Sequence, residues 1–179
     1  MDDLVLDSSY LFPLFGIALE YRNFDRIFPK LPEKYAVKYN PISLIEAKWY
    51  ILKESRKNKK KKEDRSQEED PDLLFQRYRT GLLSLRRDHR FESTLLTDEH
   101  VEELADTLLT KFEIRDYFDR MIYSTAAHLN CVLLTEDGTL HELFRKTGGE
   151  LPRPRGITRW KDLVKVDQSK IGETTCHQR

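Results

Sequence analysis

Apolar residues are arranged along this chain in short continuous runs, separated by longer segments of helical periodicity. The runs "LVL" at residues 4–6 and "CVLL" at 131–134 predict buried strands, because strands covered on both faces lack polar alternation. We also expect extended backbone over residues 35–43, a strand at 91–97 and a last strand within 156–166.

Helical spacing of apolar positions marks most of the remaining chain. The predicted helices cover residues 8–21, 44–55, 72–90, 98–112, 119–130 and 138–147. We expect Thr97 or Asp98 to cap the fourth of them. Because short buried strands alternate with helices, the chain is predicted to adopt an α/β fold with a central, mostly parallel sheet.

A charged segment separates the second and third predicted helices. Residues 56–72 are basic first and acidic second and have no apolar face. We interpret them as part of a solvated insertion, or helix extension, at about residues 53–72. Its basic half could contact phosphates, but the acids that follow favour a solvated loop. The chain is therefore interpreted as one domain over residues 1–167, followed by a polar tail at 168–179 that we expect to be disordered.

Composition adds few constraints on function. Lys plus Arg and Asp plus Glu both number 31, so no global positive field indicates a nucleic-acid partner, although a local patch is not excluded. Cys131 and Cys176 show neither zinc spacing nor a disulfide framework and are interpreted as free thiols. The N-terminus lacks the basic region of a signal peptide, and the longest apolar run, at 10–19, is too short to span a membrane. We therefore expect a cytoplasmic protein that contacts no membrane.

Four acidic residues stand out by their position relative to the predicted elements. Asp7 and Asp137 each follow a buried strand, and parallel strands place both at the sheet edge where ligands bind. Asp119 begins the helix before the strand at 131–134. That helix carries the chain back about 16 Å and the strand returns it about 17 Å, so Asp119 and Asp137 are expected at the same end. Glu46 lies in the first turn of another predicted helix.

Each of these residues also has a purely structural interpretation. Asp7 and Asp137 suit turns or helix caps. Ser43 and Glu46 have the spacing of a capping box, in which the carboxylate reaches back to the start of the helix. A capping residue in the first turn of a helix can still face a cleft, so the two roles do not exclude each other.

A helical wheel separates two neighbouring aspartates. Asp119 falls at the edge of the apolar stripe, beside the small residue Ala126, whereas Asp116 falls opposite the stripe and is expected in water. An exposed charge is the alternative interpretation of Asp119. The conjunction of the four acids carries more weight than any one of them. Carboxylates that converge without basic partners suit a hard divalent cation, Mg²⁺ or Mn²⁺, which can promote hydrolysis of phosphate esters.

Three segments carry a resemblance to a known family. They read "LVLDSSYL" at 4–11, "PISLIEAKWYIL" at 41–52 and "DRMIYSTAAHLNCVLLTEDGTL" at 119–140. They resemble the motifs of PIN-domain nucleases, the family that includes VapC-type toxins, and the resemblance spans about residues 3–145. The acidic positions of the family's motifs fall here on Asp7, Glu46, Asp119 and Asp137.

The resemblance implies a PIN-like three-layer α/β/α fold and a Mg²⁺ or Mn²⁺ site formed by these four acids. It implies metal-dependent hydrolysis of RNA phosphodiester bonds by an endoribonuclease. Ser8 and Thr135 would lie close to the acids and support their orientation. The implied partner is an RNA substrate, and the resemblance leaves open a homodimer and an antitoxin or other protein partner.

Two other functions stay open. One is a catalytically inactive PIN-like protein that binds RNA or acts as a scaffold. The other is a phosphatase or phosphotransferase, which would be expected to carry an Asp-x-Asp pattern after the first strand; here Ser9 stands two positions after Asp7. Trp49 and Trp160 are interpreted as packing residues rather than as stacking platforms.

Overall fold

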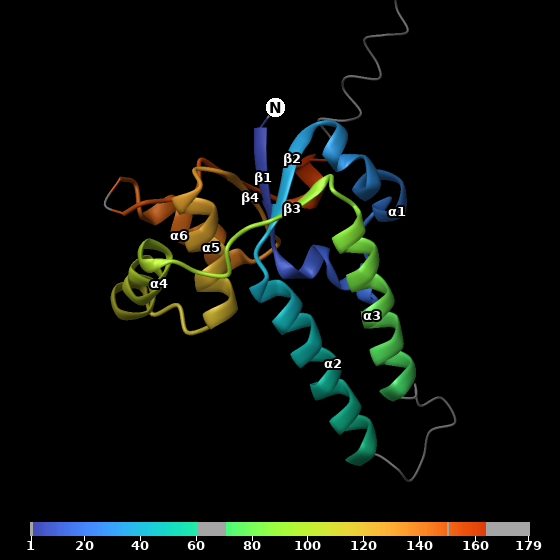
Figure 1. Cartoon of the computed structure of the whole chain (residues 1–179). Helices are drawn as coiled ribbons and strands as arrows, with labels where there is room; N and C mark the ends of the chain where they lie inside the picture. The colour runs from blue at the N-terminus through green and yellow to red at the C-terminus, as the bar shows by residue number, and fades with distance from the viewer. Residues whose placement is uncertain (1, 61–70, 150, 164–179) are drawn as a thin grey trace, which may run out of the picture.

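A central sheet of five parallel strands organises the molecule (Figure 1). The computed structural model describes residues 2–60, 71–149 and 151–163. The strand order is β3-β2-β1-β4-β5, which confirms the predicted parallel sheet and places the first strand at its centre. The strands are β1 (Asp2–Leu6), β2 (Tyr35–Tyr39), β3 (Phe91–Ser93), β4 (Val132–Leu134) and β5 (Gly156–Thr158).

Helices cover both faces of this sheet. Figure 1 shows α4, α5 and α6 together on one side and α1 on the other, while α2 and α3 form a pair that projects beyond the sheet. None of the described helices is long and apolar enough to cross a membrane. The helices are α1 (Phe24–Ile27), α2 (Ile42–Lys60), α3 (Pro71–Arg87), α4 (Glu99–Phe112), α5 (Tyr117–His128) and α6 (Gly138–Lys146), with short 3₁₀ helices η1 (Ser8–Tyr10), η2 (Phe12–Phe15) and η3 (Phe28–Glu33).

The central strand divides the apolar core into two layers. Leu4 and Leu6 pack with η1, η2, α1 and α3 on one face, whereas Val5 between them packs with α4, α5 and α6 on the other. This alternation follows from the two-residue period of a strand. Because β1 is buried on both faces, its sequence reads as a continuous apolar run. The predicted three-layer α/β/α architecture is confirmed.

The helix predicted over residues 8–21 is wrong. The chain forms two short 3₁₀ helices, η1 and η2, and the second ends at Gly16, whose φ of 79° lies in the left-handed region. Tyr10, Leu11 and Phe15 are all fully buried. A regular helix with apolar residues on every side would have exposed part of them, whereas short turns bring each one into the core.

The boundaries of α2 also differ from the prediction. The helix begins at Ile42, before Ser43, and continues to Lys60, so the basic part of the charged segment begins as a helix extension. Residues 61–70 and 168–179 lie outside the described residues, so the rest of the insertion and the polar tail stay predictions. The strand predicted at 91–97 is limited to β3, and 160–163, within the last predicted strand, are helical.

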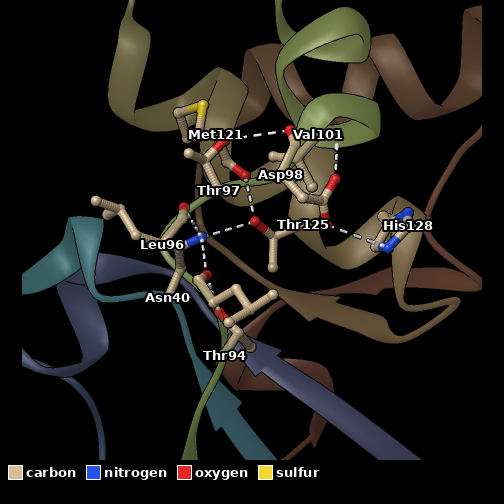
Figure 2. A network of polar contacts seen from close by, with 10 residues as sticks. Asn40, Thr94, Leu96, Thr97, Asp98, Val101, Met121, Thr125 and His128 are labelled. Atoms are coloured by element: carbon tan, nitrogen blue, oxygen red, sulfur yellow. Dashed lines mark hydrogen bonds and ion pairs between the residues drawn. The ribbon is translucent and has the colours of Figure 1, made fainter.

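The side chain of Asn40, which follows β2, fixes α2 against α5 (Figure 2). Its Oδ1 accepts a hydrogen bond from the Ile42 N–H at 2.8 Å, which caps α2, and its Nδ2 donates to Thr125 Oγ1 at 2.7 Å. Nδ2 also lies 3.1 Å from the carbonyl oxygen of Leu96, in the loop after β3. Asn40 is fully buried, so these bonds have no competition from water.

A second cap orders α4 beside α5. The Asp98 carboxylate accepts a hydrogen bond from the Val101 N–H at 2.9 Å, which confirms one of the two predicted caps. The same carboxylate lies 3.4 Å from Nε2 of His128, at the end of α5 (Figure 2). The loop between β3 and α4 is therefore tied to α5 at two points, through Asn40 and through Asp98.

Asn40→Ala is expected to lower the free energy of unfolding by about 2–3 kcal/mol, because the buried Ile42 N–H loses its acceptor and the buried Thr125 hydroxyl oxygen loses the N–H that it accepts. Urea denaturation measures this change. Thr110→Ala, at an exposed position of α4, is the matched control and is expected to change stability by less than about 0.5 kcal/mol. Equal midpoints for the Asn40→Ala variant and the parent would contradict the role given to this side chain.

Candidate active site

Asp7 lies directly beyond the end of β1, where its backbone N–H donates to the carbonyl oxygen of Leu134 at 3.0 Å. Its carboxylate accepts a hydrogen bond from the hydroxyl of Thr135. Thr135 is fully buried, and its Oγ1 also accepts from the backbone N–H of Asp137 at 3.1 Å. Thr135 therefore joins the end of β1, at Asp7, to the turn after β4, at Asp137.

Asp137 has the structural role that the sequence allowed for it. Its carboxylate Oδ1 accepts a hydrogen bond from the Leu140 N–H at 2.8 Å and caps α6. The same negative charge contributes to the raised pKa values of Asp7 and Asp119, so Asp137 also faces the other acids. The cap and a place in the acidic cluster are compatible because a helix cap at a strand end lies at the edge of the sheet.

Glu46 lies on α2, and the capping box predicted for it is wrong. Asn40 supplies the side-chain cap of this helix, and Ser43 lies inside it. Burial raises the pKa of the Glu46 carboxyl to about 7, with a further contribution from the charge of Asp7. The nearby hydroxyl of Ser8 opposes this rise, although its Oγ is buried and forms no hydrogen bond of ordinary geometry.

Asp119 lies in the first turn of α5, and its pKa is raised further than that of Glu46. Its pKa is raised to about 8, mainly by burial and in smaller part by the charges of four acids: Asp116, Asp7, Asp137 and Glu46. The carboxylate is therefore surrounded by negative groups from four other points of the chain. This is the convergence that the helix and strand lengths predicted for Asp119 and Asp137.

The pKa of Asp7 is raised for a similar reason. Burial is the largest cause and the charge of Asp137 adds to it, while the hydrogen bond from Thr135 and the backbone N–H groups of Ser8 and Ser9 act in the opposite direction. The structure thus brings all four predicted acids to one edge of the sheet, with Ser8 and Thr135 beside them. Every neighbouring charge that acts most strongly on Asp7, Glu46 and Asp119 is acidic.

Asp116 is a fifth acid that sequence reasoning placed outside the site. It is exposed, as predicted, but its charge raises the pKa values of Asp119 and Glu46, so it faces the cluster. The helical wheel fails here because Asp116 precedes the helix as its N-cap, with its carboxylate accepting from the Phe118 N–H at 2.8 Å. An aspartate at the N-cap position, in "RDYF" at residues 115–118, was the sequence signal that could have placed Asp116 near Asp119.

The donor set of this edge fits a hard divalent cation. Mg²⁺ and Mn²⁺ prefer carboxylate oxygens, and a cation would offset both the burial and the neighbouring negative charges that raise the pKa values of Asp7, Glu46 and Asp119. In the described part of the chain, no group of three or more His, Cys, Asp or Glu side chains already stands as a metal site. The carboxylates would therefore have to turn toward a bound ion.

The comparison with protein families identifies the fold. A family model described as "PIN domain" matches residues 4–146. The chain belongs to the PIN-domain family. PIN domains are generally nucleases that use divalent metals, which agrees with an acidic cluster at this edge. The residues matched include all four predicted acids, Asn40, and the helices α2 and α5 that Asn40 connects.

A comparison with solved structures supports the same fold. A chain in the crystal structure of VapBC2 from Rickettsia felis, bound to a DNA fragment from their promoter, superposes with a TM-score of 0.54. The two chains share 16% sequence identity, and the match covers 88% of this PIN-domain protein and 98% of the other chain. At this identity the similarity shows the fold alone. A comparison with curated protein sequences found no match.

In metal-free buffer, Asp119→Asn is expected to stabilise the protein more at pH 8 than at pH 5. The folded carboxyl keeps its proton up to about pH 8, whereas the unfolded chain loses it near pH 4. Its contribution is therefore fully favourable below about pH 4 and falls as the pH rises toward 8. The amide removes this loss, and we expect a gain about 1–2 kcal/mol larger at pH 8 than at pH 5.

Urea denaturation at the two pH values measures this difference. Glu103→Gln, at an exposed position of α4, is the matched control and is expected to show no pH-dependent gain. A destabilisation by Asp119→Asn that is equal at both pH values would show that the carboxyl is not buried among other acids.

Proposed function

We propose that this PIN-domain protein is a metal-dependent endoribonuclease, in which Asp7, Glu46, Asp119 and Asp137 hold Mg²⁺ or Mn²⁺. One observation carries the proposal: acids from four separate segments converge at the carboxyl edge of the sheet, where burial and the neighbouring negative charges raise the pKa values of Asp7, Glu46 and Asp119. Such an arrangement destabilises the folded protein unless a positive charge is bound. Because members of the PIN-domain family are generally nucleases, we assign the bound cation a role in catalysis.

The protein's own groups would divide the work at this edge. When bound, a divalent ion supplies positive charge that stabilises phosphate oxygens and favours deprotonation of a water molecule. Thr135 orients the Asp7 carboxylate by donating its hydroxyl hydrogen, and it fixes the turn that carries Asp137. Glu46 and Asp119 are each half-buried, so the charges around them are only partly screened by water.

RNA as the substrate and a protein partner are parts of the same proposal. RNA follows from the resemblance of the acidic motifs to PIN-domain ribonucleases. The fold neighbour was solved as VapBC2 bound to promoter DNA, which supports a search for an antitoxin-like chain as a partner of this protein. A homodimer is the second assembly to test, by sedimentation of the purified protein.

A catalytically inactive RNA-binding or scaffold protein is the second candidate. The observation in its favour is that no metal site stands ready among the described His, Cys, Asp and Glu side chains. The convergence of acids argues against it, because their mutual repulsion lowers the stability of the fold and would serve no purpose in an inactive protein. Turnover separates the two functions directly.

Cleavage of a pool of labelled RNAs in Mn²⁺ or Mg²⁺ tests the nuclease. We expect cleavage by the parent, loss of cleavage in EDTA, and a rate at least about a hundredfold lower for Asp119→Asn, since even the partners of metal ligands contribute about 10- to 100-fold. Glu103→Gln is expected to cleave like the parent. Cleavage by the Asp119→Asn variant at the parental rate would refute this site, and metal binding without cleavage of any RNA would favour the scaffold.

A further inference from the structure

Trp49 on α2 is exposed to an extent that packing does not explain. Its relative exposure is 53%, whereas Trp160, the other tryptophan of the chain, is 3% exposed and donates its Nε1 hydrogen to the Arg22 carbonyl oxygen. The interpretation of Trp160 as a packing residue is confirmed, and that of Trp49 is wrong. Tryptophan has a large aromatic face, so this exposed ring is available for contact with a ligand.

The exposed ring lies one helical turn beyond the acidic edge. Glu46, Trp49 and Lys53 follow one another on α2 at spacings of three and four, which places them on one face of the helix. On the facing helix, Phe118 immediately precedes Asp119 in the first turn of α5. The rings of Trp49 and Phe118 have centroids 6.5 Å apart. α2 and α5 therefore carry a pair of aromatic rings, Trp49 and Phe118, next to the acids Glu46 and Asp119.

A cation accompanies the ring. The Lys53 Nζ lies 5.0 Å from the centroid of Trp49, within the range of a cation–π interaction. An aromatic face beside a lysine is the combination that proteins use to hold single-stranded nucleic acid, with the base on the ring and the phosphate near the amine. Bases are accessible for stacking in single strands, whereas in a duplex they are already stacked on one another.

We propose that Trp49 stacks on an unpaired base of single-stranded RNA next to the phosphodiester that the acidic edge receives. The base takes the place of the Lys53 amine over the ring, and the amine moves to the neighbouring phosphate. This proposal rests on the proposed function and adds a residue on α2 that positions the RNA strand beside the acidic edge. Phe118 supports the Trp49 ring from the side of α5. The face is therefore a subsite of the same site, set about one helical turn, roughly 5 Å, from Glu46.

Binding of a labelled single-stranded RNA pool tests the subsite, measured by fluorescence anisotropy on the uncleaving Asp119→Asn protein in Mg²⁺. Trp49→Ala is expected to raise Kd by about tenfold or more, and Trp49→Phe, which keeps an aromatic face, by less than about threefold. Leu83→Ala, at a similarly exposed position of α3, is the matched control and is expected to leave Kd unchanged. The same RNA annealed to its complement is expected to show no dependence on Trp49.

Two readouts separate this inference from the proposed function. In the cleaving parent, Trp49→Ala is expected to lower kcat/KM about tenfold, mainly through KM, with an unchanged melting temperature. If the parent cleaves and Trp49→Ala alters neither Kd nor kcat/KM, the subsite is wrong and the nuclease stands. If the parent does not cleave but Trp49→Ala still weakens single-strand binding, the nuclease is wrong and base stacking stands.

Two further outcomes would overturn the subsite. Absence of any single-stranded RNA binding by the Asp119→Asn protein and by the parent would remove both proposals. A change in oligomeric state on Trp49→Ala, measured by sedimentation with RNA binding unaffected, would show that the exposed ring is covered by protein instead of by a base.

Discussion

The crowding of partly buried carboxyl groups at one edge of the sheet is the constraint on which the candidate active site depends. Asp7, Glu46 and Asp119 come from three different segments, and burial together with neighbouring acids raises the pKa of each. Folding alone would favour a pattern in which each acid meets a base or water. The sheet instead delivers the acids to one edge, because parallel strands all end there and each is followed by a turn or a helix start.

Two polar side chains hold this unfavourable arrangement in place. Thr135 connects Asp7 to the turn before α6, and Asn40 connects the start of α2 to α5. Both are fully buried, so their hydrogen bonds fix the helices that carry Glu46 and Asp119 relative to the sheet. This frame holds together the helices and strands that carry the acids, against the repulsion between their charges.

The sequence predicted those parts of the site that follow from strand ends and element lengths. Asp7 and Asp137 were predicted because each follows a buried apolar run, and Asp119 because the helix and strand lengths return the chain to the same end of the sheet. Glu46 was found although its predicted cap was wrong, since the capping group is Asn40, two residues before the helix begins. The segment after Ser8 could not be predicted from periodicity, because burial on all sides gives no helical pattern, and the exposure of Trp49 depends on how α2 meets α5.

The most direct test of the account is calorimetric titration of Mn²⁺ into the metal-free protein. The account predicts saturable binding by the parent and by Glu103→Gln, and binding weakened at least about tenfold in both Asp7→Asn and Asp119→Asn, two residues from widely separated parts of the chain. Binding of equal strength in all four proteins, or none at millimolar Mn²⁺, would contradict the claim that these acids form one metal site.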